Sequence, residues 1–467
     1  MSAHAPTTAH PIDEIPALVA RLRAGFESGR TRPAEYRLAQ LDRLRALLVE
    51  NADALVRALE TDLRKPDPEG WTTDIGFSLQ DLAVTRKNLR RWMKPRRVGT
   101  PLQLQPARSW LVPEPVGVVL VIAPWNYPVQ LALAPLAAAI AAGNCALVKP
   151  SEVTPHVSAT LAELLPRYLD PDCYAIVEGG VAETQALLAE RWDHIFYTGN
   201  GRVGRIVMEA AARHLTPVTL ELGGKSPCLV DDDVDLELTA RRIAWGKFLN
   251  CGQTCVAPDY VLVHASREEE LVDRLVRAVR RFYGDDPQRS PDLARIVNEQ
   301  HVDRLAKLLE SGTVVIGGRV DRADRYVAPT ILRNVSPDSP VMQEEIFGPI
   351  LPVLPVRDME EAIAFVNARP KPLALYLFTN RPETEEAVLA RTSAGGVTVN
   401  ATIWHLANPN LPFGGVGESG MGAYHGRYGF EAMSHWKPVL KKSWRLDPSV
   451  GYPPYTSWKK KLLKRVV

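Results

Sequence analysis

The feature that most constrains the fold is an alternation of short apolar runs with helical segments from residue 117 onward. The runs are VGVVLVIA, CALVKP, YAIVEGG, DHIFYTG and PVTLELGG, and stretches with helical spacing separate them. Strands of near-continuous apolar character that alternate with helices predict a parallel sheet with helices on both faces. A second alternation runs from about residue 227 to about residue 400. A chain of 467 residues is also too long for one core, so we expect an α/β protein with two doubly wound domains.

The charge and the cysteine content exclude several classes of protein. A formal charge of +2 gives no general attraction to nucleic acid, so none is expected as a partner. Five scattered cysteines do not suit a disulfide framework and favour a reducing compartment. No basic segment followed by an apolar one begins the chain, and prolines interrupt its most apolar stretch, residues 116–143. We therefore expect a cytoplasmic protein.

Two cysteines lie four residues apart in the stretch KFLNCGQTCVAPDY, residues 247–260. No histidine stands beside them, and CGQTC lacks the ligand spacing of a zinc site, so no metal is expected. The spacing also differs from that of a Cys-x-x-Cys redox pair. Cys251 and Cys255 are each either a buried inert thiol or a nucleophile, since even a small thiolate fraction is strongly nucleophilic.

Two further side chains suit chemistry at a thiol. Glu221 ends an apolar strand and precedes two glycines, so its carboxylate can lie where backbone approaches closely. Burial there would raise its pKa and make it a base near neutral pH, whereas a solvated glutamate at a strand end is the alternative. Asn126 lies between prolines just after a buried strand, where its amide can donate to a developing oxyanion or simply hold a turn.

The stretch FYTGNGRVG carries a glycine pattern typical of phosphate binding. Gly199, Gly201 and Gly204 follow a strand and open a helix, where pyrophosphate can meet backbone N–H groups. The same pattern also occurs in a simple tight turn. Lys149 and Glu152 end another strand of the same sheet, so they are candidates for a ligand site or for a helix cap.

Two later stretches are also notable: one contains an acid and an aromatic residue, and the other is the basic C-terminal tail. In EEIFGP, Glu345 can bond a ribose hydroxyl and Phe347 can pack on an aromatic ring, or both can be ordinary loop residues. The tail, GYPPYTSWKKKLLKRVV, is basic with interleaved apolar side chains. We expect a terminal helix that is exposed or packed on a partner, with peripheral membrane contact as the alternative.

Together these stretches resemble the aldehyde dehydrogenase superfamily. The motifs PWNYP, KPSE, FYTGN, LELGGKSP, NCGQTC, EEIFGP and PFGGVGESGMG occur in its order and spacing from about residue 110 to about residue 440. The stretches CGQTCVAPDY, KPLALYLF and GMGAYHG are similar to its class 3 group, which includes fatty and aromatic aldehyde dehydrogenases. The resemblance implies an oxidoreductase that converts an aldehyde to a carboxylic acid.

The resemblance also implies a role for each matching residue. Cys255 is the nucleophile that forms a thiohemiacetal and then a thioester, Asn126 holds the oxyanion, and Glu221 activates water. NAD is the expected cofactor, with NADP as an alternative. The implied cofactor-binding residues are Trp125, Lys149, Glu152, Gly199, Asn200, Gly204, Glu345 and Phe347. The implied residues of the aldehyde tunnel are Tyr127, Trp404 and His405.

Asn200 and Arg202 depart from the family's commonest pattern, and Arg202 and Glu152 bear on the choice between the two cofactors. Asn200 stands where many relatives have serine, which changes the turn at the phosphates. Arg202 adds a positive charge that favours NADP, whereas Glu152 favours NAD because it repels a 2′-phosphate.

The family's architecture implies uneven domains and a homodimer. The expected parts are a cofactor-binding and a catalytic Rossmann-like domain, a small β extension that bridges subunits, and a tail. The cofactor-binding domain takes residues 1–97 and 116–223, the catalytic domain 224–424, the bridging strands 98–115 and 425–446, and the tail 447–467.

Three other functions use the same residues. An acylating dehydrogenase would pass the acyl group to coenzyme A, but Glu221 favours water as the acceptor. A thioester hydrolase would need only Cys255 and Glu221, which leaves the cofactor motifs unexplained. An inactive binding protein would not need every chemical position to be filled.

Overall fold

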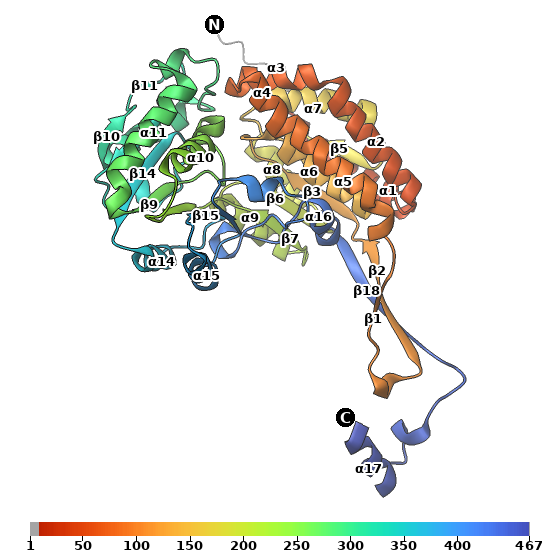
Figure 1. The fold of residues 1–467 in the computed structure, drawn as a ribbon. Coiled ribbons are helices and arrows are strands. Elements are labelled where there is room, and N and C mark those ends of the chain that lie inside the picture. Colours follow the sequence, from red (N-terminus) through yellow and green to blue (C-terminus); the bar gives the residue numbers. More distant parts are fainter. Residues whose placement is uncertain (1–8, 467) are drawn as a thin grey trace.

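The computed structural model describes residues 9–466, which form two lobes and a projecting arm (Figure 1). The first lobe is built on a six-stranded sheet with the order β17-β7-β6-β3-β4-β5. Its strands are β3 (Val118–Ile122), β4 (Cys145–Lys149), β5 (Tyr174–Ile176), β6 (His194–Thr198), β7 (Val218–Glu221) and β17 (Gly420–Met421). Strands β3 to β7 run parallel. The order reverses between β3 and β6, so the sheet has its switch point there.

Helices cover both faces of this sheet. They are α1 (Ile15–Glu27), α2 (Ala34–Glu50), α3 (Ala52–Leu63), α5 (Phe77–Trp92), α6 (Pro128–Ala142), α7 (Pro155–Tyr168), α8 (Val181–Ala189) and α9 (Gly201–Ala212). Right-handed crossovers place α6 and α7 on one face and α8 and α9 on the other. Every residue of β3 and α6 is buried, because α6 lies between the sheet and the outer helices α2 and α5. The most apolar stretch of the chain is thus a central strand, a turn and a buried helix.

The second lobe is built on a seven-stranded sheet with the order β10-β13-β14-β9-β8-β15-β16. Its strands are β8 (Pro227–Val230), β9 (Tyr260–His264), β10 (Thr313–Ile316), β13 (Thr330–Arg333), β14 (Ile350–Val356), β15 (Ala374–Phe378) and β16 (Gly396–Val399). Only β10 pairs antiparallel within this sheet of the described chain. The accompanying helices are α10 (Leu236–Phe248), α11 (Glu268–Tyr283), α12 (Glu299–Leu308), α13 (Pro340–Gln343), α14 (Met359–Asn367) and α15 (Pro382–Arg391). The predicted α/β class with two wound sheets is confirmed.

The chain crosses back to the first lobe near the end of the second one. Strand β17, within the range expected for the catalytic domain, pairs antiparallel with β7 of the first sheet. The chain therefore returns to the first lobe before residue 424, and α16 (Gly426–Ala432) then packs on α5 and α6. The predicted domain boundaries stay a prediction.

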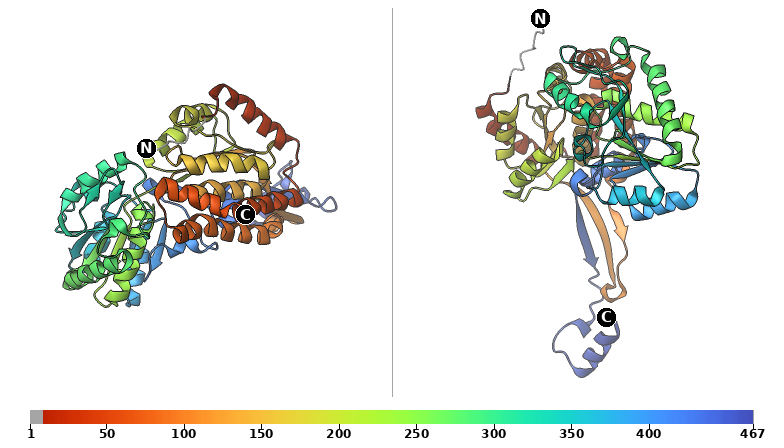
Figure 2. Two further views of the ribbon diagram at one scale, coloured as in Figure 1. Left: turned by 90° about the horizontal axis from the view of Figure 1, so that it is seen from above. Right: turned by 90° about the vertical axis from the view of Figure 1, so that its left-hand side faces the viewer.

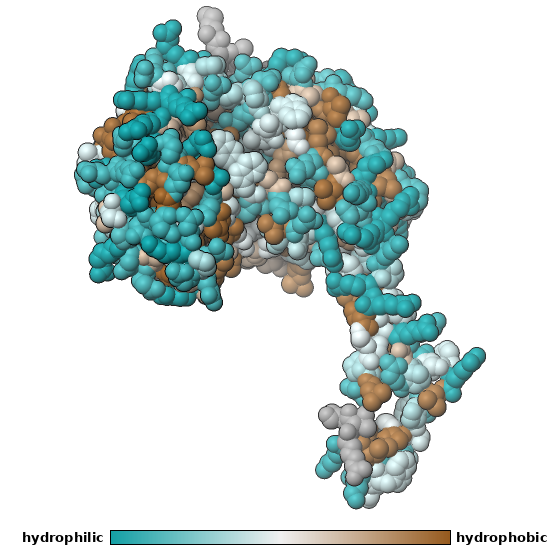
Figure 3. Space-filling model, viewed as in Figure 1, coloured by the Kyte–Doolittle hydropathy of each residue, from teal (hydrophilic) through white to brown (hydrophobic). Residues whose placement is uncertain are grey.

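A three-stranded antiparallel arm projects from the first lobe (Figure 2). It consists of β1 (Arg96–Val98), β2 (Ala107–Pro115) and β18 (Ser434–Lys442), and the chain beyond it ends in α17 (Ser457–Val466). In the view of Figure 3, hydrophilic side chains dominate both lobes and hydrophobic ones also show on the arm. Leu102 is 84% exposed and Trp444 is 100% exposed. Within residues 9–466, every helix is too short or too polar to span a bilayer.

Candidate active site

The loop after α10 takes the two neighbouring cysteines to different places. The chain turns sharply there, with left-handed backbone at Asn250 (φ 52°) and Cys251 (φ 53°). The next position requires glycine, since a Cβ at Gly252 would lie 2.2 Å from the carbonyl oxygen of Gly348. This turn buries Cys251 in the core of the second lobe, at 1% exposure, and brings Cys255 to the wall of a cavity.

The cavity brings together the three predicted catalytic residues. Its volume is about 750 Å³, and both lobes contribute to its wall. Asn126 reaches it from the turn between β3 and α6, Glu221 from the end of β7, and Cys255 from the loop after α10. The Nδ2 of Asn126 donates to the carbonyl oxygen of Gln253 at 3.1 Å, two residues before Cys255. An amide, a carboxyl and a thiol that are far apart in sequence therefore face one space.

Burial determines the protonation of the two titratable groups among them. Both carboxyl oxygens of Glu221 are buried and have no hydrogen-bond partner within residues 9–466. Because a carboxylate would lose its hydration there, burial raises the pKa of Glu221 well above its usual value. Burial also raises the pKa of the Cys255 thiol, and the carboxyls of Glu345 and Glu221 raise it further. In this arrangement burial favours the neutral form of both groups.

The turn between β6 and α9 faces the same cavity. The side chain of Asn200 caps α9 by accepting an N–H of the first turn at 3.0 Å, so this departure from the serine of many relatives preserves a cap. A Cβ at Gly199 would lie 2.2 Å from the hydroxyl oxygen of Tyr197. Gly204 lies outside the wall, and a Cβ there would lie 3.0 Å from Leu222, so this glycine permits close packing of helix on strand. The N-terminus of α9 can receive a pyrophosphate.

The other predicted cofactor residues also line the cavity. At the end of β4, the Nζ of Lys149 lies 2.7 Å from Oε2 of Glu152. Burial raises the pKa of Glu345 to about 8. The ring of Phe347 meets Trp125 edge-on, with centroids 5.3 Å apart. Carboxyl groups can accept ribose hydroxyls and aromatic rings can pack on a pyridine ring, so the residues present fit a bound dinucleotide.

Two residues of the wall come from α12, which sequence patterns did not indicate as part of a site. The ring of His301 lies 5.2 Å from that of Trp125, centroid to centroid. Arg304 donates to the carboxyl of Glu344 at 3.1 Å and to the carbonyl oxygen of Glu345 at 3.3 Å, so it holds the backbone that carries Glu345. In the sequence, α12 shows only the spacing of an amphipathic helix.

The predicted residues of the aldehyde tunnel lie outside the wall of this cavity. Tyr127 is buried, and its hydroxyl shares a hydrogen bond of 2.6 Å with that of Thr254. Trp404 is 61% exposed and stacks on Trp245. His405 shares a hydrogen bond of 2.9 Å with a threonine hydroxyl of β16. Contact between these residues and an aldehyde stays a prediction.

The fold and the site define a class of protein, the α/β oxidoreductases that place a cysteine thiol beside a dinucleotide-sized cavity. Residues 5–439 match the family model described as "Aldehyde dehydrogenase family". The chain belongs to the aldehyde dehydrogenase family, and its members oxidise aldehydes with NAD(P).

Curated relatives and solved structures agree with this assignment. The chain is 49% identical over 445 residues to "Aldehyde dehydrogenase, dimeric NADP-preferring" of Mus musculus, which covers 95% of this chain and 98% of that protein. It is also 49% identical to "Aldehyde dehydrogenase family 3 member B1" of Homo sapiens, covering 97% of each chain. The solved structure of Staphylococcus aureus AldH in a substrate-bound state matches with a TM-score of 0.94 and 46% identity, covering 97% of this chain and 99% of that one. The predicted likeness to the class 3 group is confirmed.

A more distant solved structure shows the same fold with a cofactor. Indole-3-acetaldehyde dehydrogenase complexed with NAD+ matches with a TM-score of 0.86 and 27% identity, covering 93% of this chain and 90% of that one.

Proposed function

We propose that this protein oxidises an aldehyde to the carboxylic acid through a thioester on Cys255, with NAD(P)+ as electron acceptor. The observation that carries the proposal is the convergence of Cys255, Asn126 and Glu221 on one cavity whose remaining wall suits a dinucleotide. The three side chains supply a nucleophile, an oxyanion donor and a base.

Cys255 forms the first bond. The thiol first gives its proton to water, and the thiolate then attacks the carbonyl carbon, whose oxygen becomes an oxyanion. The amide of Asn126 and the backbone N–H of Cys255 then donate to this oxygen, and donors that are already in place need little reorganisation. The Asn126 amide has two N–H groups, and since one is bonded to the carbonyl of Gln253, the other can serve the oxyanion.

The same carbon then loses two electrons and becomes a thioester. NAD(P)+, when bound, would accept the hydrogen of that carbon together with its two bonding electrons, as a hydride. Cys255 holds the carbon in a fixed position for this transfer. Glu221 first gives its own proton to solvent through the open cavity, and its carboxylate then takes a proton from the attacking water. The resulting hydroxide attacks the thioester, the carbon–sulfur bond breaks, and the acid leaves.

We infer that NAD+ is the preferred cofactor and that NADP+ is also accepted. Glu152 lies beside Lys149 at the end of β4, and its carboxylate repels a 2′-phosphate. Arg202, also in the wall, adds a positive charge that lowers this penalty. Support for both comes from the names of relatives, one NADP-preferring and one solved with NAD+. The ratio of kcat/KM for the two cofactors measures the preference.

We also infer a homodimer in the cytoplasm. The mouse relative is named as dimeric, and the arm exposes apolar side chains such as Leu102 that a partner can cover. Five free cysteines suit a reducing compartment. The basic helix α17 is expected to be exposed or packed on the partner, with membrane contact as the less favoured alternative. Light scattering should give twice the mass of one chain.

Product analysis tests the reaction class. The protein is incubated with an aldehyde and NAD+, once with coenzyme A and once without it. In both cases we expect free carboxylic acid and reduced cofactor in equal amounts. Acyl-coenzyme A as the product would favour acyl transfer. Hydrolysis of a thioester without oxidation of any aldehyde would favour a hydrolase. A series of aliphatic and aromatic aldehydes, compared by kcat/KM, then defines the substrate class.

A further inference from the structure

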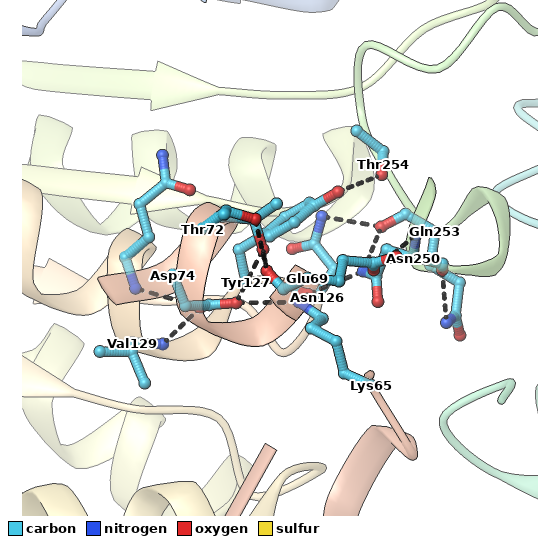
Figure 4. A network of polar contacts seen from close by, with 12 residues as sticks. Lys65, Glu69, Thr72, Asp74, Asn126, Tyr127, Val129, Asn250, Gln253 and Thr254 are labelled. Carbon is cyan, nitrogen blue, oxygen red and sulfur yellow. Dashed lines mark hydrogen bonds and ion pairs between the residues drawn. The ribbon is translucent and has the colours of Figure 1, made fainter. Parts of the chain in front are cut away.

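A buried ion pair outside the catalytic and cofactor motifs contacts the turn that carries Asn126. Lys65 follows α3 and Asp74 lies in a π-helical turn, Trp71–Gly76. Both side chains are 0% exposed, and Nζ of Lys65 lies 2.9 Å from Oδ2 of Asp74 (Figure 4). Because charges lose their hydration at such depth, a buried pair adds little net stability. Its other contacts indicate a different role.

Lys65 and Asp74 hold the backbone on both sides of Tyr127. The Nζ of Lys65 donates to the carbonyl oxygen of Asn126 at 3.1 Å and lies 4.1 Å from the ring centroid of Tyr127. The Oδ1 of Asp74 accepts the N–H of Val129 at 3.1 Å and that of the next residue at 3.3 Å. These two N–H groups belong to the first turn of α6, where no partner exists within the helix. The direction in which the Asn126 side chain leaves the backbone is thereby restricted.

The same carbonyl oxygen of Asn126 is also bonded to the loop of the nucleophile. The Nδ2 of Asn250 donates to it at 2.8 Å and to the carbonyl oxygen of Gln253 at 3.1 Å (Figure 4). The backbone N–H of Asn250 donates in turn to Oε1 of Glu69 at 2.8 Å. Segment 65–74 therefore contacts both the turn of the oxyanion donor and the loop that leads to the thiol.

We propose that Lys65 and Asp74 are positioning residues that keep the Asn126 amide within reach of the substrate oxygen. The inference rests on the proposed role of Asn126 in holding the oxyanion. Lys65 and Asp74 act only through the backbone of that turn. A displacement of about 1 Å at a catalytic group can cost about 10²-fold in rate, so a small relaxation of the turn is enough to matter.

A double-mutant cycle tests the inference. Lys65→Met removes the ammonium but keeps an unbranched chain, and it is measured alone and together with Asn126→Ala. We expect Lys65→Met to lower kcat by about 10-fold to 10²-fold while the Kd of NAD+ changes less than about twofold. In the Asn126→Ala background the same change should lower kcat by less than about twofold, because no amide remains to be positioned.

A matched control separates positioning from general loss of structure. Arg37 is another buried cation, and its Nη1 donates to the carbonyl oxygen of Ala141 at the opposite end of α6, at 2.9 Å. Arg37→Met is expected to lower the melting temperature. It should change kcat by the same small factor whether residue 126 is the wild-type Asn126 or is replaced in Asn126→Ala. If Lys65→Met does not fold, Asp74→Asn, which keeps the shape of the side chain, takes its place in the cycle with the same expected non-additivity.

Two results would overturn the inference. An equal loss of kcat in both backgrounds would show that the ion pair does not act through Asn126, and an unchanged kcat in Lys65→Met would show that it positions nothing. An active wild-type enzyme with an additive cycle overturns this inference alone. A wild-type protein that oxidises no aldehyde overturns the proposed function as well.

Discussion

The side-chain amide of Asn126 donates to the carbonyl oxygen of Gln253 at 3.1 Å, and this bond joins the turn after β3 to the cysteine loop of the second lobe. Gln253 is itself fixed. Its Nε2 donates to the carbonyl oxygens of Asn250 at 3.0 Å and Arg295 at 2.9 Å. Its Oε1 accepts the N–H of Val297 at 2.9 Å. The proposed oxyanion donor and the proposed nucleophile are therefore held by one bonded loop.

The first prediction concerns this amide. Asn126→Ala should lower kcat by about 10²-fold to 10³-fold, the usual cost of losing an oxyanion donor. Binding of NAD+, measured as a Kd, should change little, because the amide serves the transition state. Asn51→Ala, which removes a structural amide bonded to Leu47 and Tyr168, is the control and should keep wild-type kcat. Wild-type activity in Asn126→Ala would contradict the assigned role.

The second prediction distinguishes two glycines of one motif. A Cβ at Gly199 would lie 2.2 Å from the Tyr197 hydroxyl, whereas at Gly201 the nearest atom is the flexible end of Arg205 at 3.3 Å. Gly199→Ala should therefore raise the KM of NAD+ about tenfold, and Gly201→Ala should change it less than about twofold. Adding Tyr197→Phe to Gly199→Ala removes the clashing oxygen and should restore part of the loss. Equal effects of the two alanines would argue against this geometry.

The third prediction concerns the pH dependence of stability. Glu221 has a raised pKa in the folded protein, so above its ordinary pKa of about 4.3 the folded state binds more protons than the unfolded chain. The free energy of unfolding therefore falls as pH rises toward the folded pKa, by up to about 1.4 kcal/mol per pH unit. Glutamine does not titrate, so the melting temperature of Glu221→Gln relative to wild type should increase as pH rises above the ordinary pKa of glutamate toward the raised pKa of Glu221. A constant difference across this range would mean that Glu221 is not buried as a protonated acid.

The fourth prediction concerns the two cysteines. Cys251 is packed in the core and burial raises its pKa to about 12, while Cys255 lines the cavity. Cys251→Ser should keep most of the activity, with a modest loss of stability from a buried hydroxyl. Cys255→Ser should lose measurable aldehyde oxidation, because a serine hydroxyl has no thiolate to attack the carbonyl. The reverse pattern would move the nucleophile to Cys251.

Sequence patterns predicted the fold well and the site in part. Central parallel strands are buried on both faces, so stretches such as VGVVLVIA are apolar throughout, and the two wound sheets follow from them. Asn126 and Cys255 lie in recognisable local stretches, so both were candidates before the structure placed them on one cavity.

Other parts of the fold and of the site have no recognisable pattern in the local sequence. The strand β17 has only two residues, which is too short to show a period. His301 and Arg304 look like the polar face of an amphipathic helix, and only the packing of the two lobes brings them to the cavity. Lys65 and Asp74 look like solvated charges near a helix end, and their burial depends on contacts with residues 61 and 55 positions away.

The most direct measurement of the central claim is to locate the acyl group during turnover. In Glu221→Gln the base is missing, so NAD+ and an aldehyde should give one equivalent of reduced cofactor per active site and then a slow phase. Tandem mass spectrometry of the peptide with both cysteines, rapidly denatured in acid, should find the acyl group on Cys255. An acyl group on Cys251, or a full burst with no acylated peptide, would contradict covalent catalysis by Cys255.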